Sequence, residues 1–137
     1  MKKFFALIAS LIAVFACCFA VACNGKEPVK VDENTVVITA TDSSFDFDGK
    51  TLKAYMDDLQ ERGKLTYTIS KGMVTEINGK SQTLNSYWML YTSDEENAST
   101  EWGTFEYEEK LYGSATVGAE LLTVKEGCIY IWAYQTF

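Results

Sequence analysis

Histidine is absent from this chain of 137 residues. Without an imidazole base, neither a Ser–His nor a Cys–His nucleophilic site can form, and the common zinc sites lack their nitrogen ligand. A phosphate-binding loop is also missing: residues 49–51 (Gly-Lys-Thr) imitate its end, but the glycine required five positions earlier is Ser44. The sequence therefore predicts a binding or structural protein and no enzyme.

Basic residues are scarce as well. The chain has 12 Lys and Arg side chains against 19 Asp and Glu, which gives a net charge of −7. So acidic a protein is repelled by the phosphates of nucleic acids and by anionic lipid headgroups. We expect no nucleic-acid partner.

The first 22 residues have the pattern of a targeting segment. Lys2 and Lys3 precede an uninterrupted apolar stretch over residues 4–22, and polar residues return immediately afterwards. Residues 20–23 (Ala-Val-Ala-Cys) resemble the lipobox of bacterial lipoproteins, in which small residues precede a cysteine that is lipidated and becomes the first residue after cleavage. This resemblance implies a signal peptide over residues 1–22 and a lipid on Cys23.

Three alternatives to this assignment stay open. Cys17 is a second candidate for lipidation, and the apolar stretch is long enough to serve as an uncleaved membrane anchor or in ordinary secretion. Every alternative places the rest of the chain outside the cytoplasm. Cleavage before Cys23 removes two of the 12 basic side chains and none of the 19 acidic ones. Acyl chains on Cys23, rather than a basic patch, would therefore hold the protein to the bacterial cell membrane.

After residue 22 the chain contains one proline, Pro28, and, besides Cys23, one cysteine, Cys128. Residues 23–34 are mostly polar and are typical of a flexible tether. Residues 35–137 have the length and apolar content of a single domain. With Cys23 lipidated, Cys128 has no disulfide partner within the chain, and its apolar neighbours favour a buried inert thiol over a reactive one.

One amphipathic helix is predicted after residue 50. Thr51 is a suitable N-cap, and Gly63 supplies a stop. Four apolar side chains between them follow the spacing of one helical face: Leu52, Tyr55, Met56 and Leu59. This pattern is typical of a helix of about three turns that lies on a sheet.

The remaining patterns are extended. Residues 87–91 (Tyr-Trp-Met-Leu-Tyr) form an unbroken apolar run, which favours a strand covered on both faces over a buried helical turn. Lys71-Gly72 and Asn78-Gly79 are turn signals, and residues 92–100 read as an exposed acidic loop. Further strands are expected over 35–40, 65–70, 73–77, 105–107 and 128–134. The fold class that follows is α+β.

Several segments together resemble a known family. They are residues 49–52 at the start of the helix, 76–79 (Glu-Ile-Asn-Gly), 86–91 (Ser-Tyr-Trp-Met-Leu-Tyr) and 125–134. In this order and spacing they are similar to the transcobalamin C-terminal-like domain of unknown function found in bacterial surface proteins. The resemblance covers nearly all of residues 35–137.

This resemblance implies a β-grasp-like fold, with one amphipathic helix packed on a mixed or antiparallel sheet, among soluble-ligand-binding domains. It also implies a corrinoid as ligand. In transcobalamin itself, however, the small domain closes over the corrinoid against a helical domain that has no counterpart in this sequence. With no histidine, the chain also has no imidazole to offer to cobalt.

Two sets of residues are candidates for binding. Trp102 lies among polar neighbours, where an aromatic ring can stack on a flat or sugar-like ligand, and we pair it with Tyr112; a tryptophan that caps the end of the sheet is the alternative. Asp42, Asp46 and Asp48 gather three carboxylates in one loop, and oxygen ligands of this kind favour calcium over transition metals. A solvated acidic turn is the alternative to a calcium site.

We therefore expect a lipid-anchored extracytoplasmic binding module that takes a soluble small ligand or a surface partner. The alternatives are a structural or adhesive cell-surface module without a small ligand, and a calcium-binding surface domain. A pocket lined by Trp102 and Tyr112 would favour ligand binding, and a flat exposed sheet edge would favour the adhesive module.

The substitution Cys23→Ser is expected to prevent lipidation and to leave a larger, unprocessed precursor, because the modified sulfur is missing. Metabolic labelling with a fatty acid measures this directly, with Cys17→Ser as the matched control that keeps its label. Label that persists in Cys23→Ser and vanishes in Cys17→Ser would move the modified residue to position 17.

Overall fold

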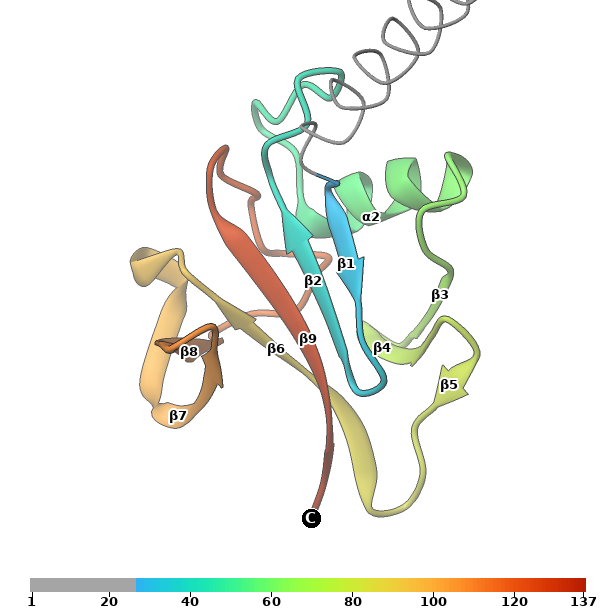
Figure 1. Ribbon diagram of the computed structural model, residues 1–137, viewed down its shortest axis with the longest axis vertical. Helices are drawn as coiled ribbons and strands as arrows, with labels where there is room; N and C mark the ends of the chain where they lie inside the picture. Colours follow the sequence, from blue (N-terminus) through green and yellow to red (C-terminus); the bar gives the residue numbers. More distant parts are fainter. Residues whose placement is uncertain (1–26) are drawn as a thin grey trace, which may run out of the picture.

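The computed structural model describes residues 27–137, which form an α+β domain with one α-helix in this range and two antiparallel sheets (Figure 1). The larger sheet has six strands in the order β1-β2-β9-β6-β8-β7, and the smaller sheet has three in the order β3-β4-β5. The elements are β1 (Val29–Val31), β2 (Thr35–Thr39), α2 (Leu52–Glu61), β3 (Tyr67–Ser70), β4 (Met73–Ile77), β5 (Lys80–Ser81), β6 (Ser86–Thr92), the 3-10 helix η1 (Glu95–Asn97), β7 (Ala98–Tyr107), β8 (Lys110–Ala115) and β9 (Ile129–Thr136).

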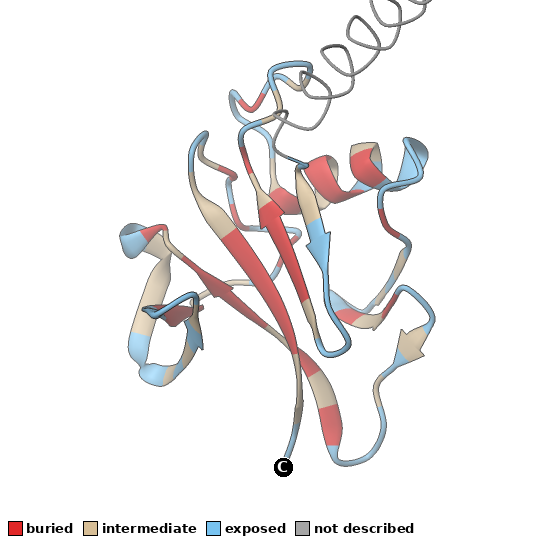
Figure 2. Ribbon diagram, viewed as in Figure 1, coloured by how far each residue is buried: buried red, intermediate tan, exposed pale blue. Residues whose placement is uncertain are grey.

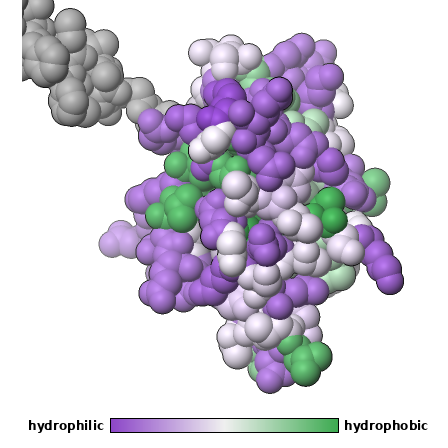
Figure 3. All heavy atoms as spheres, turned by 90° about the vertical axis from the view of Figure 1, so that its right-hand side faces the viewer, coloured by the Kyte–Doolittle hydropathy of each residue, from purple (hydrophilic) through white to green (hydrophobic). Residues whose placement is uncertain are grey.

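Helix α2 matches its sequence prediction closely. The Thr51 hydroxyl accepts a hydrogen bond from the backbone N–H of Ala54 at 3.2 Å, as an N-cap does. The four predicted apolar residues, Leu52, Tyr55, Met56 and Leu59, are all fully buried. The outer surface on the side of the molecule that carries α2 and β3–β5 is mostly hydrophilic or intermediate, with a few separate hydrophobic patches (Figure 3). No helix in residues 27–137 is long and apolar enough to span a membrane.

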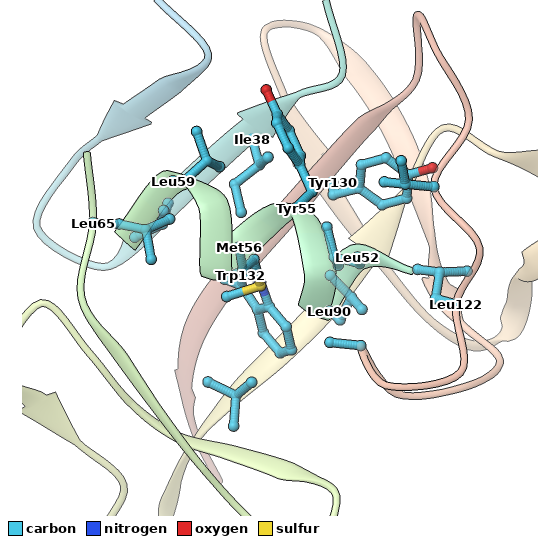
Figure 4. Packing of buried hydrophobic residues seen from close by; sticks show 14 of the residues in the cluster. Ile38, Leu52, Tyr55, Met56, Leu59, Leu65, Leu90, Leu122, Tyr130 and Trp132 are labelled. Carbon is cyan, nitrogen blue, oxygen red and sulfur yellow. The ribbon is translucent and has the colours of Figure 1, made fainter. Parts of the chain in front are cut away.

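The two central strands, β9 and β6, are buried on both faces, as Figure 2 shows for the middle of the sheet. On the first face, Trp88, Leu90 and Trp132 join the four buried residues of α2 in one core cluster. Figure 4 shows Leu90 and Trp132 of this cluster from the helix side. On the second face, Tyr91 and Ile131 belong to a separate cluster. The strand predicted over residues 87–91, covered on both sides, is thereby confirmed.

The second face is covered by the hairpin of β7 and β8, which curls away from the plane of the sheet (Figure 1). The rings of Tyr91 and Phe105 stack there with centroids 5.4 Å apart. The curl brings the two ends of the sheet together, because Lys30 of β1 lies 3.4 Å from the carboxylate of Glu108 at the hairpin tip. A six-stranded sheet thus covers part of itself without a second helix in the described residues.

Three tight turns connect neighbouring antiparallel strands. In each, both central residues have positive φ: Lys71 and Gly72, Asn78 and Gly79, Glu108 and Glu109. Such turns match the right-handed twist of the strands that they join. The sequence predicted the first two, and the third contains no glycine or asparagine to announce it.

Other predictions need correction. Residues 29–31, which were assigned to the flexible tether of residues 23–34, form β1 and pair with Val36–Ile38 of β2. The ordered sheet therefore begins before residue 35. Cys128 is a free thiol that is only partly buried. The predicted signal peptide over residues 1–22, with Cys17 and Cys23, lies outside the described residues.

The acidic segment after β6 is not a fully exposed loop as predicted. Asp94 is only 4% exposed, and its carboxylate accepts hydrogen bonds from Asn97 Nδ2 at 2.7 Å and from Lys125 Nζ at 2.9 Å. Burial alone would raise the pKa of Asp94, but the hydrogen bonds from Asn97 and Lys125 hold it below the usual carboxyl range. This ion pair fastens the β6–β7 connection to the loop that precedes β9.

We expect Asp94→Asn to lower the free energy of unfolding at neutral pH by about 1–3 kcal/mol, because a buried network loses its charged acceptor. A carboxyl group with a lowered folded-state pKa stabilises the fold above its unfolded pKa of about 3.9, and this contribution disappears as the pH falls through the folded-state value. The stability of the parent should therefore decline below about pH 5 more steeply than that of the variant.

Denaturant unfolding across this pH range measures the difference. Glu95→Gln, at an exposed neighbour in η1, is the matched control and should behave like the parent. Equal pH profiles for Asp94→Asn and the parent would contradict a role for the Asp94 carboxylate.

Candidate functional site

The structure does not bring the two aromatic candidates into one pocket. Trp102 lies on β7 and is 64% exposed, whereas Tyr112 lies on β8 and is 7% exposed. Tyr112 packs in the second-face cluster with Tyr91 and Ile131. Tyr112 is therefore a core residue, and Trp102 is left as an isolated exposed ring.

The three acidic candidates, Asp42, Asp46 and Asp48, also differ in their surroundings. Asp42 forms an ion pair with Arg62 at 2.5 Å and accepts hydrogen bonds from the backbone and hydroxyl of Ser44. Those hydrogen bonds from Ser44, with help from Arg62, lower the pKa of Asp42. Asp46 is exposed and accepts a hydrogen bond from the backbone N–H of Asp48, as in a local turn.

No group of three or more acidic or cysteine side chains in residues 27–137 is arranged to hold a metal ion. The structure does not gather Asp42, Asp46 and Asp48 into one set of ligands, and Arg62 neutralises Asp42, the one carboxylate of the three that is partly buried. An open hollow of about 620 Å³ does lie beside this loop, next to residues 123–126. Of the acidic residues that line it, Asp46, Asp48 and Glu126 are exposed, whereas Asp42 is paired with Arg62.

A smaller hollow lies along β6. It has a volume of about 270 Å³ and is open to solvent. Its walls come from the start of β4, from the middle of β6, from the segment that follows β8 and from one residue of β9. Its apolar lining includes Met73, Trp88, Leu90, Val117, Ala119 and Trp132. We call this feature the β6 hollow.

The walls of the β6 hollow are largely apolar and rigidly placed. The indole nitrogen of Trp88 donates a 2.8 Å hydrogen bond to the carbonyl of Lys80, and its ring packs edge-on against Tyr134 at 5.1 Å between centroids. Trp132 is 4% exposed and lies beneath α2 in Figure 4. Met73, by contrast, is 57% exposed and forms part of the rim.

The backbone of β6 is open at this hollow. β8 pairs with β6 only at Tyr91 and Thr92. The rest of β6, from Ser86 to Leu90, has β9 as its ladder partner on one side. Beside Trp88 the other side of the strand is therefore an unpaired sheet edge.

A third hollow, of about 580 Å³, lies between β1 and the tip of the β7–β8 hairpin. Val29, Val37 and Ile129 contribute its apolar lining, and the Lys30–Glu108 ion pair bridges its mouth. It lies beside the edge strand β1 and lacks the tryptophan rings that line the β6 hollow.

Three tyrosines outside the lining of these hollows, Tyr55, Tyr67 and Tyr130, are not poised for proton transfer. Burial raises the pKa of Tyr55 and of Tyr130 to about 12, so both phenols stay neutral near physiological pH. Burial and the Asp57 carboxylate raise the pKa of Tyr67 further in the same direction. None of these groups is suited to act as a general base at neutral pH.

Comparison with known proteins gives no relative: no family model, no curated protein and no solved structure matches this chain. The candidate site is therefore defined by the geometry of this domain. It is an apolar hollow at the open edge of a central strand in a small α+β domain. Sequence reasoning found its tryptophans but assigned them to the core, because an unpaired strand edge leaves no signal in the sequence.

The structure predicts that calcium does not bind specifically to the loop of Asp42, Asp46 and Asp48. A site-bound ion raises stability by RT ln(1 + [L]/Kd), whereas screening acts equally for any salt of the same ionic strength. Calcium and sodium salts at matched ionic strength should therefore shift the melting temperature equally. A selective rise with calcium that disappears in Asp46→Asn/Asp48→Asn would contradict this expectation.

Proposed function

We propose that this chain is an extracytoplasmic binding module, anchored to the bacterial cell membrane by a lipid on Cys23, that takes a soluble ligand or a segment of a surface partner into the β6 hollow. The module has no catalytic role. The observation that carries the proposal is an apolar hollow, walled by Trp88, Leu90 and Trp132, beside an unpaired strand edge. Apolar concavities with a few fixed polar groups are the usual form of binding sites.

The size of the hollow limits the ligand. Pockets that enclose drug-sized molecules have volumes of about 300–1,000 Å³. The β6 hollow, at about 270 Å³, accepts one compact apolar group. A corrinoid, which the family resemblance implies, would have only an edge inside it. Cobalamin is therefore the weaker candidate. The β-grasp-like fold and the family resemblance stay predictions.

A structural or adhesive surface module without a small ligand is the second candidate. The exposed ring of Trp102 on β7 and the outer edge of β1 favour it, because open edges and isolated exposed aromatic rings are common in contacts between proteins. The two candidates differ in what the β6 hollow does. In the adhesive module it stays empty.

Native mass spectrometry of the full chain in detergent, after exposure to an extract of the source cells, tests the proposal. We expect a retained small molecule or peptide in the parent. Met73→Ser should lose it, because this change removes an apolar side chain from the rim of the hollow. Leu84→Ser is the matched control, since Leu84 is 92% exposed and lies outside the hollow.

If Met73→Ser, Leu84→Ser and the parent all retain the ligand equally, the ligand binds outside the β6 hollow. A parent that retains nothing would favour the adhesive module. Added cyanocobalamin, measured in the same way, reports on the corrinoid separately from the hollow's own ligand.

A further inference from the structure

We propose that the occupant of the β6 hollow is an extended peptide segment, which pairs with the backbone of Trp88 as an added strand and inserts one apolar side chain between Met73, Leu90 and Ala119. This inference rests on the proposed function and names the ligand class of the same site. Strand addition of this kind uses main-chain hydrogen bonds for affinity and a side-chain pocket for specificity.

The register of the sheet sets the direction of the Trp88 backbone. Trp88 lies opposite Tyr134 in β9, and the N–H of Tyr134 donates to Asn34 on the β2 side of the sheet at 2.8 Å. In an antiparallel ladder, two opposed residues point either both toward each other or both away. The N–H and C=O of Trp88 therefore point away from β9, toward the unpaired edge.

Within the described residues this pair of groups has no backbone hydrogen-bond partner, although Trp88 as a whole is only 7% exposed. β8 ends its pairing with β6 at Tyr91, and no backbone hydrogen bond joins Trp88 to β4 or to a loop in residues 27–137. One donor and one acceptor side by side on a strand match the N–H and C=O of a single residue in another extended chain. An extended peptide satisfies both of them with one residue and repeats the pattern along the strand.

The hollow lies where the side chain of such a residue would go. Met89 and Ser114 are also in its lining. In the antiparallel pairing Ser114 lies opposite Tyr91, and Met89 packs with the second-face cluster, so both side chains belong to the other face of the sheet. Met89 and Ser114 therefore line the hollow through their backbone atoms, which lie at the open edge. The hollow thus runs from the edge of β6 inward to Leu90 and Trp132 on the first face.

The two walls leave only a narrow entry. A Cβ atom on Gly118 would lie 3.2 Å from the carbonyl oxygen of Gly72, so the backbones of these two segments almost touch at one end. An extended chain pairs with a strand at a spacing of about 4.8 Å, whereas a helix is about 10 Å across with its side chains. This geometry favours a peptide strand over a helical partner.

The acidic charge of the protein favours a basic peptide. The chain has a net charge of −7, and Glu120 is exposed beside Gly72 at the rim. A basic partner is attracted by this field, and the attraction weakens as salt screens it. The salt dependence should appear mainly in the association rate.

The test uses the full chain in micelles of a zwitterionic detergent and two peptides, followed by ¹H–¹⁵N NMR. The first is a capped pentapeptide of lysine, valine, threonine, valine and lysine, whose β-branched residues favour an extended chain. The second is the same peptide with every interior amide N-methylated, which removes its donors and keeps its side chains and charge.

We expect the first peptide to bind and to slow amide hydrogen exchange at Trp88, which should be fast in the free protein compared with Met89 and Tyr91. N-methylation should weaken binding by about tenfold or more, since a hydrogen-bonding group of Trp88 is then covered without a partner. Met73→Ser should weaken the first peptide, and Leu84→Ser should not.

Other outcomes overturn the inference. Equal binding of both peptides, without protection of the Trp88 amide, would make the hollow an apolar site that ignores the backbone, and the proposed function would survive. Retention of a non-peptide ligand by native mass spectrometry while neither peptide binds would have the same consequence. A Trp88 amide that is already protected in a dimeric free protein would show that a second copy fills the edge. If no ligand of any kind is retained and neither peptide binds, the proposed function fails as well.

Discussion

The fold depends on burying β9 and β6 on both faces with only one α-helix in the described residues. Alternate residues of β9 enter different clusters: Trp132 packs under α2, and Ile131 packs on the opposite face. Leaving either face in water would expose large apolar side chains, each worth about 1.5–3 kcal/mol of burial. The sheet therefore has to cover its own second face, which it does by curling the β7–β8 hairpin over Tyr91.

The open edge at Trp88 follows from the end of β8. β8 pairs with Thr92 and Tyr91 of β6 and ends at Ala115, so no strand continues alongside Trp88. The chain after β8 continues as the irregular segment over residues 116–121 and forms a wall rather than a strand. A hollow is left between this wall and β4.

Local chemistry made much of this architecture predictable from the sequence. The cap of Thr51, the helical face of α2 and the Asn78-Gly79 turn are each set by neighbouring residues, and each matched the structure. The turn at Glu108-Glu109 was missed, because its residues do not favour positive φ and tertiary pairing of β7 with β8 imposes it. Asp94 was misplaced for a similar reason: its partner Lys125 lies 31 residues away. The site itself depends on where β8 stops pairing with β6, and no local sequence signal marks that position.

An unpaired strand edge in a folded domain promotes association with other extended chains. Here the open edge is only as long as the gap between Ser86, whose carbonyl accepts from Thr83, and Tyr91, where β8 begins to pair. The edge is also recessed between β4 and the segment after β8. A flat sheet from another protein could not approach it, because both walls would collide before the backbones met. Recessing the edge thus excludes edge-to-edge aggregation while it leaves room for a single narrow chain, and the same two walls that protect Trp88 define the selectivity of the site.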